Sequence, residues 1–98
     1  MVVATTRLDL LIPGCRSLKE KRGVVKGLTA GIRRRFNVSV SEVGHQDLWQ
    51  RATIAVAAVS GEGFHARKVM HEVERYVATW PAVEVIASDV TLVDPEDR

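Results

Sequence analysis

The stretch Ser17-Leu18-Lys19-Glu20-Lys21-Arg22 decides how this chain folds, because it starts a long helix directly after an apolar strand. Ser17 has a hydroxyl suited to capping a helix N-terminus. Glu20 follows three residues later, so its carboxylate is expected to reach back to the amide of Ser17. Before this stretch, residues 2–12 are mostly apolar, alternate with polar side chains and end at a Pro-Gly pair. The sequence therefore predicts a strand over residues 2–12 and a helix over residues 18–36.

The rest of the chain shows the same two patterns of apolar residues, the alternation of strands and the three-to-four-residue spacing of helices. Apolar residues favour strands at 38–41, 51–59 and 83–93, and they recur at helical spacing over 64–79. Asn37 is expected to close the first helix in a left-handed conformation. The order strand-helix-strand-strand-helix-strand predicts an α+β ferredoxin-like sandwich, in which one four-stranded antiparallel sheet has both helices on one face.

Composition limits the class of protein. A chain of 98 residues can bury one core, so we expect a single domain over residues 1–98 with a polar tail from about residue 94. No apolar run approaches the roughly 20 residues of a membrane-spanning helix, and the N-terminus does not resemble a secretory signal. Cys15 is the only cysteine, so no intrachain disulfide can form. We expect a cytoplasmic protein without cofactor or membrane partner.

Positive charge is concentrated on the predicted first helix. The formal net charge is only +2, yet 8 of the 14 Lys and Arg residues lie between Arg16 and Arg35. On a helical wheel, an arc of roughly 60° contains four of them: Lys19, Arg22, Lys26 and Arg33. Such a stripe can neutralise phosphates irrespective of base sequence, so RNA binding is expected at seven cations: Arg16, Lys19, Lys21, Arg22, Lys26, Arg33 and Arg34. The alternative is a solvated helix face that keeps the protein soluble.

The sheet face opposite the helices is expected to be uncovered. It should present Thr5, Arg7, Asp9 and Leu11 from the first strand with Thr53, Ala55, Ala57 and Val59 from the third. Because this face has no aromatic residue on its central strands, the base stacking of an RNA-recognition motif is not expected there. A second hypothesis is a protein-interaction or homo-oligomerisation module that buries four of these residues against a partner or a second copy: Leu11, Ala55, Ala57 and Val59.

The predicted loop at residues 45–50 collects an imidazole, a carboxylate and an indole. Trp49 is expected either to anchor a partner or, in the interpretation we favour, to cover the end of the core while Asp47 accepts backbone amides. His45 and Asp47 have no evident third ligand, so no metal site is assigned. The lone cysteine has no evident general base beside it, and the histidines of the second helix have no evident nucleophile nearby in the sequence. We therefore assign no catalytic residue and expect a non-enzymatic protein.

Three glycines occur at spacing four in the first helix, at positions 23, 27 and 31. Each costs a helix up to about 1 kcal/mol relative to alanine. They fall on the side away from the apolar stripe formed by Leu18, Val25, Leu28, Ile32 and Phe36. We expect there either close approach of another backbone or a flexible outer face.

Three segments together resemble the YlxP-like family of small bacterial proteins, a domain of unknown function. They are Ser17-Leu18-Lys19-Glu20-Lys21-Arg22, Val38-Ser39-Val40-Ser41-Glu42 and Asp47-x-Trp49-Gln50-Arg51. The resemblance covers nearly the whole chain. It implies a ferredoxin-like fold and a setting near translation genes, because relatives are often encoded beside initiation and ribosome-maturation factors. It implies no established activity, and it makes ribosomal RNA or ribosomal particles the expected partners of the basic helix.

Overall fold

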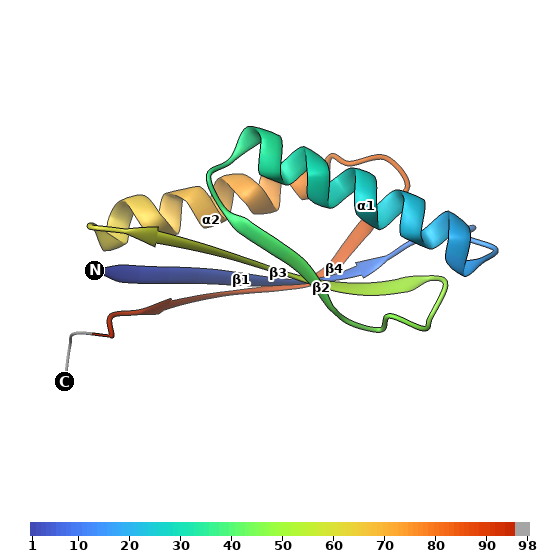
Figure 1. Cartoon of the computed structure of the whole chain (residues 1–98), viewed down its shortest axis with the longest axis horizontal. Helices are drawn as coiled ribbons and strands as arrows, with labels where there is room; N and C mark the ends of the chain where they lie inside the picture. Colours follow the sequence, from blue (N-terminus) through green and yellow to red (C-terminus); the bar gives the residue numbers. More distant parts are fainter. Residues whose placement is uncertain (96–98) are drawn as a thin grey trace.

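The computed structural model describes residues 1–95, and its elements follow in the order β1 (Val2–Leu11), α1 (Leu18–Arg35), β2 (Ser39–Gly44), β3 (Arg51–Ser60), α2 (Gly63–Ala78) and β4 (Glu84–Val93) (Figure 1). β1 pairs antiparallel with β3 and β4, and β2 pairs antiparallel with β3, so the sheet order is β2-β3-β1-β4. Both helices cover the same face of the sheet. The predicted ferredoxin-like sandwich is confirmed. Among residues 1–95, neither helix is apolar over enough of its length to cross a bilayer.

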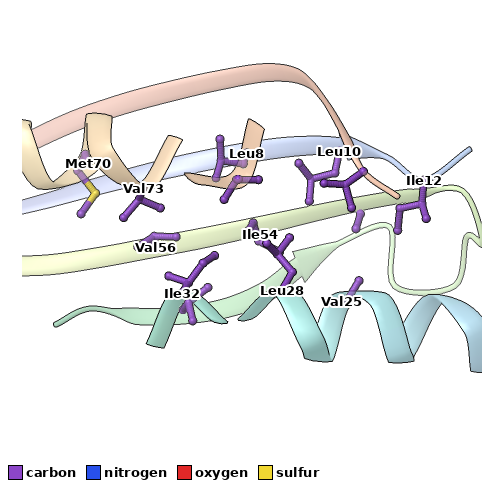
Figure 2. Close-up of a cluster of buried hydrophobic side chains, with 14 of the residues drawn as sticks. Leu8, Leu10, Ile12, Val25, Leu28, Ile32, Ile54, Val56, Met70 and Val73 are labelled. Atoms are coloured by element: carbon purple, nitrogen blue, oxygen red, sulfur yellow. The ribbon is translucent and has the colours of Figure 1, made fainter. Parts of the chain in front are cut away.

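The core lies between the sheet and the two helices. Alternate residues of the central strands point toward the helices, as the period of two requires, and they meet the apolar stripes of α1 and α2. The buried side chains include Leu8, Leu10, Ile54, Val56, Val25, Leu28, Ile32, Met70 and Val73 (Figure 2). The intervening residues of β1 and β3 therefore point to the opposite face of the sheet, which neither α1 nor α2 covers.

The N-terminus of α1 is capped almost as predicted. The Ser17 hydroxyl accepts a hydrogen bond from the amide of Glu20 at 3.1 Å. The Glu20 carboxylate, however, accepts from the amide of Arg16 at 2.7 Å and not from that of Ser17. Ser17 has extended backbone angles, and the amide within reach of the carboxylate is that of the preceding residue.

The prediction of a left-handed Asn37 at the end of α1 is wrong, because among the described non-glycine residues only His45 and Ala82 have positive φ. The helix ends at Arg35, and at the next residue, Phe36, the backbone becomes extended while the Phe36 amide still donates to the carbonyl of Ile32 at 2.9 Å. The Phe36 ring packs edge-on against Tyr76 of α2, with 5.7 Å between ring centroids. This packing accompanies the change of direction at the helix end.

The two helices cover different parts of the sheet. The molecule is elongated, with principal extents of 46 × 24 × 18 Å. In Figure 1, α1 and α2 occupy opposite halves of the long axis and overlap near the middle. α1 packs beside the edge strand β2, whereas α2 packs on β1, β3 and β4. One flank of α1 therefore faces the β2 edge of the sheet, and the C-terminal part of its other flank faces α2.

Candidate nucleic-acid interface

The surface of α1 is strongly cationic. Its sequence LKEKRGVVKGLTAGIRRR contains seven basic residues and one acidic residue, Glu20, whose carboxylate already binds the amide of Arg16. Six of the seven predicted cations are exposed: Arg16, Lys19, Arg22, Lys26, Arg33 and Arg34. The helix therefore presents positive charge along most of its length.

A groove between α1 and the edge strand β2 gathers three of these cations, and we call it the α1–β2 groove. It is lined by Arg22, Val25, Lys26, Thr29 and Arg33 of α1 and by Ser41 and Glu42 of β2. Arg22 and Arg33 are about 16 Å apart along the helix axis, at 1.5 Å per residue. The Arg33 guanidinium also donates to the Val40 carbonyl of β2 at 2.9 Å. Charged donors spaced along a groove can follow a phosphate backbone.

The other exposed cations lie outside this groove. Lys19 borders a separate hollow, mostly apolar, whose lining includes Cys15, Gly23 and Val24. Arg16 precedes α1, and Arg34 follows Arg33 by about 100° around the helix. The predicted stripe is thus divided by the fold: its Arg22, Lys26 and Arg33 share one groove, whereas Lys19 lies at the margin of another hollow.

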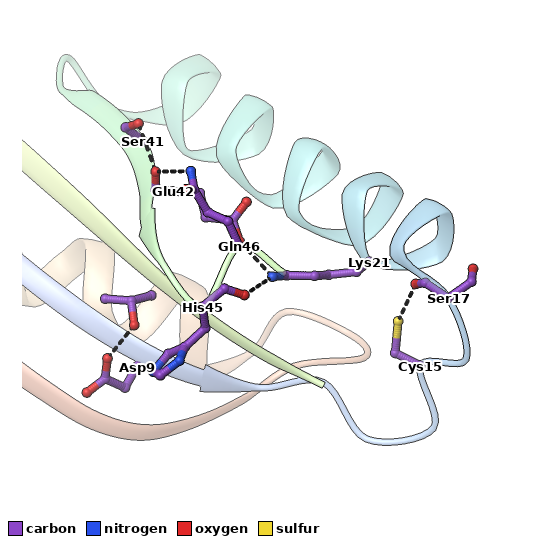
Figure 3. Close-up of polar contacts among 9 residues, drawn as sticks. Asp9, Cys15, Ser17, Lys21, Ser41, Glu42, His45 and Gln46 are labelled. Carbon is purple, nitrogen blue, oxygen red and sulfur yellow. Dashed lines mark hydrogen bonds and ion pairs between the residues drawn. The ribbon is translucent and has the colours of Figure 1, made fainter. Parts of the chain in front are cut away.

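Lys21 is not a surface residue, so its predicted role as a phosphate ligand is wrong. Only 1% of its side chain is exposed. Its ammonium lies 2.9 Å from Oε2 of Glu42 and donates to the carbonyl of His45 (Figure 3). Lys21 precedes Val25 by four residues, which places it on the inner face of α1. The ammonium is thus satisfied inside the fold and links α1 to β2 and to the loop that follows β2.

The loop at residues 45–50 is held by backbone contacts rather than by its aromatic residue. The His45 carbonyl also accepts from the amide of Leu48 at 3.1 Å, and the Gln50 carbonyl accepts from the amide of Ile12 at 2.8 Å. Trp49 is 51% exposed and lies outside the core cluster, so the interpretation that it covers the end of the core is wrong. Its role as a partner anchor stays a prediction.

Asp47 was expected to accept backbone amides within this loop, but no hydrogen bond to its carboxylate occurs among residues 1–95. The contacts at the end of the core come from Gln50, which also donates from its side chain to the Cys15 carbonyl at 3.3 Å. The chain crossing from β2 to β3 is therefore tied to the segment before α1, and Asp47 and Trp49 stay on the outside.

The uncovered sheet face has the composition that the alternation predicted. The register places Thr5 opposite Ala57, Arg7 opposite Ala55 and Leu11 opposite Arg51. Ala55, Ala57 and Leu11 are partly exposed and Val59 is exposed, so the four residues predicted to bind a partner lie on one face. We call this the open face. Thr53 is the exception, because its buried hydroxyl donates to Asp9 at 2.7 Å.

Two glycines of α1, Gly27 and Gly31, face the aromatic residues at the end of α2, so the prediction of a flexible outer face is wrong for these two. A Cβ at Gly31 would lie 2.6 Å from the Tyr76 hydroxyl and 3.0 Å from the Trp80 ring, and one at Gly27 would lie 3.8 Å from that ring. Gly23 has open space. The helix turns by about 40° over each four-residue step, so the row winds from solvent toward α2.

The sequence did not reveal a second cationic hollow, which lies between the end of α1 and α2. We call it the α1–α2 cleft. It is lined by Arg35, Phe36, Glu72, Arg75, Tyr76 and Thr79. The guanidinium carbon of Arg35 lies 5.5 Å from the centroid of the Tyr76 ring. Arg35 and Arg75 are forty positions apart, and helical spacing within one segment gives no signal that they meet.

Comparisons with known proteins agree with the fold. The YlxP protein of Bacillus subtilis (strain 168), described as uncharacterized, is 35% identical over 83 residues, which are 85% of this chain and 90% of that protein. The cofactor-independent oxygenase SnoaB from Streptomyces nogalater has a TM-score of 0.55 at 12% identity, covering 100% of this chain and 97% of that one. Rv0793 from Mycobacterium tuberculosis has a TM-score of 0.51 at 16% identity, covering 100% and 98%.

The two solved structures, at such low identity, show a shared fold alone. The family model described as "Protein of unknown function (DUF503)" matches residues 3–90, and the Bacillus relative matches across most of both chains. The Lys21–Glu42 ion pair joins two of the three segments on which the family resemblance rests. The chain belongs to the DUF503 family.

Proposed function

We propose that this protein is a non-enzymatic cytoplasmic RNA-binding protein that docks on ribosomal RNA or ribosomal particles through the α1–β2 groove. The observation that carries the proposal is the gathering of Arg22, Lys26 and Arg33 in one groove. Within the described part of the chain, none of the three forms an ion pair with a carboxylate. Glu42 also lines the groove, but its carboxylate is paired with Lys21.

The chemistry of the groove favours the RNA backbone over the bases. Guanidinium and ammonium groups bind phosphates, and neutralised phosphates release counterions, which supplies affinity without sequence preference. The open face has no aromatic residue on β1 or β3 to stack a base. The choice of ribosomal RNA rests on the translation setting that the family resemblance implies.

Salt-sensitive co-sedimentation with ribosomal particles tests this proposal. The tagged protein should sediment with the particles at low salt and be released at high salt, because three phosphate contacts correspond to a loss of about 40-fold in affinity between about 50 and 200 mM salt. Arg22→Glu with Lys26→Glu should abolish the association. The measurement is the fraction of protein in the particle peaks of a gradient.

A matched charge reversal on α2 is the control. Arg67 and Lys68 are exposed and line neither the α1–β2 groove nor the α1–α2 cleft. Arg67→Glu with Lys68→Glu should leave most of the association intact, although it changes the net charge by the same amount. Association that is indifferent to salt, or that both double variants weaken equally, would contradict the proposal.

We further propose that the open face pairs with a second copy of the chain or with another protein. A row of valines across its end favours this: Val3 on β1 is opposite Val59 on β3 and Val93 on β4. Val59 is 70% exposed and Val93 is 50% exposed. Contiguous apolar side chains on a surface favour burial against a partner, and homodimers bury such patches across a two-fold axis.

Sedimentation equilibrium at micromolar concentration tests the homodimer. The wild-type chain should have twice the monomer mass, and Val59→Asp with Ala57→Arg should return it to a monomer, because two charges would be buried within the interface. Arg67→Asp on α2 is the control that should leave the mass unchanged. A wild-type monomer would exclude self-association through the open face. If the tagged double variant pulls down the same proteins as the tagged wild-type chain, binding of another protein to this face is excluded.

A further inference from the structure

We propose that the RNA segment bound by α1 is double-stranded, with one backbone in the α1–β2 groove and the other at the α1–α2 cleft. This inference rests on the RNA-binding function proposed above and adds the shape of the partner. Helix α1 has a cation-lined hollow on each flank, and a single RNA strand would occupy only one of these hollows.

The second hollow is a basic site in its own right. Arg35 from α1 and Arg75 from α2 both line the α1–α2 cleft, and neither has a carboxylate partner at ion-pair distance among residues 1–95. The Arg35 guanidinium lies over the Tyr76 ring at 5.5 Å from the centroid, which holds it at the cleft. Two guanidiniums contributed by different helices suit a phosphate that lies between them.

The last turn of α1 sends positive charge to both flanks. Arg33, Arg34 and Arg35 are consecutive, so their side chains leave the helix at intervals of about 100°. Arg33 lines the groove beside β2, and Arg35 lines the cleft beside α2. An α-helix with its side chains is about 10–12 Å wide, so the cations of the groove and those of the cleft are separated by about a helix diameter. The two backbones of one duplex can each contact one of these two groups of cations, and proteins recognise duplex RNA by shape and backbone contacts.

Glu72 provides an internal check on this assignment. Its carboxylate lines the α1–α2 cleft together with the two arginines and opposes the approach of a phosphate. It does not line the α1–β2 groove. Glu72→Gln should therefore strengthen binding of a duplex and leave the binding of a single strand unchanged.

The experiment compares a 20-base-pair RNA duplex of mixed sequence with one of its strands, using fluorescence anisotropy at several salt concentrations. The wild-type protein should bind the duplex at least about tenfold more tightly than the strand. Arg35→Gln with Arg75→Gln should weaken duplex binding about tenfold and lower its salt slope by about two, while changing strand binding less than about twofold. Arg22→Gln with Lys26→Gln should weaken both probes, and Arg67→Gln with Lys68→Gln should weaken neither.

The failures of the two proposals are distinguishable. Equal affinity for both probes, or a duplex affinity that Arg35→Gln with Arg75→Gln leaves unchanged, overturns the double-stranded assignment while the α1–β2 groove keeps its role. No effect of Arg22→Gln with Lys26→Gln on either probe overturns RNA binding through the groove itself. Arg75→Gln alone leaves the Arg35–Tyr76 contact in place, so a loss of duplex affinity in that variant does not come from the loss of that contact.

Discussion

Replacing Lys21 by methionine is expected to lower the free energy of unfolding by about 3–5 kcal/mol, because it breaks a buried ion pair from one side. The Glu42 carboxylate would lose the cation 2.9 Å away, and the His45 carbonyl would lose a donor. Methionine matches the apolar stem of lysine and lacks only its terminal nitrogen, so the loss reports mainly the missing charge. Because the Glu42 side chain retains 21% exposure, we expect a value near the lower end of this range.

Urea denaturation of Lys21→Met, Glu42→Gln and the double variant measures this effect. The double variant should be less destabilised than the sum of the single variants, since each single variant leaves one charge without its partner. Lys19→Met is the matched control. Lys19 is exposed, two positions earlier in the same helix, and its loss should change stability by about 0.5 kcal/mol or less. Equal stabilities for Lys19→Met and Lys21→Met would contradict the buried pair.

Gly31→Leu is expected to lower the free energy of unfolding by about 2–3 kcal/mol, because the new side chain overlaps the contact between α1 and α2. Its Cβ alone would lie 2.6 Å from the Tyr76 hydroxyl and 3.0 Å from the Trp80 ring. Moving Tyr76 would disturb two aromatic contacts, since its ring centroid lies 5.7 Å from those of Phe36 and of Trp80. Overpacking therefore outweighs the gain in helix propensity of about 1 kcal/mol.

Gly23→Leu measures the gain in helix propensity alone, without the overpacking that occurs at Gly31. A Cβ at Gly23 meets nothing within 4 Å, so Gly23→Leu should raise stability by up to about 1 kcal/mol. Thermal unfolding followed by circular dichroism gives both values in one series. If Gly31→Leu and Gly23→Leu shift the midpoint in the same direction, the aromatic contact does not constrain the helix as inferred.

The architecture was predictable because each element shows its period over enough residues. β3 alternates over Arg51–Ser60, and α2 carries its buried residues at helical spacing from Ala66 to Val77. These are local properties, and the order of elements then leaves few topologies to consider. The open face followed from the same alternation, since residues of β1 and β3 that point away from the core meet side by side in the register.

The site was less predictable because its decisive contacts join distant segments. Lys21 continues the spacing of Leu18, Val25 and Leu28, so the helical wheel does place it on the inner face of α1. A lysine on such a face is ordinarily assigned to the surface unless a partner is known, and Glu42 lies on another element. The cleft that joins Arg35 to Arg75 depends on how far α1 and α2 overlap, and the sequence of neither helix specifies that overlap.

Arg33 covers part of the edge strand β2 in addition to lining the α1–β2 groove. β2 ends the sheet on one side, and unpaired main-chain groups on an edge strand invite pairing with another extended chain. The Arg33 guanidinium binds the carbonyl of Val40 on that strand and covers part of it with charge. Removing Arg33 would thus expose a template for aggregation at the same time as it removed a contact to RNA. Arg22 and Lys26, which donate to no main-chain carbonyl within residues 1–95, are for this reason the cleaner probes of the groove.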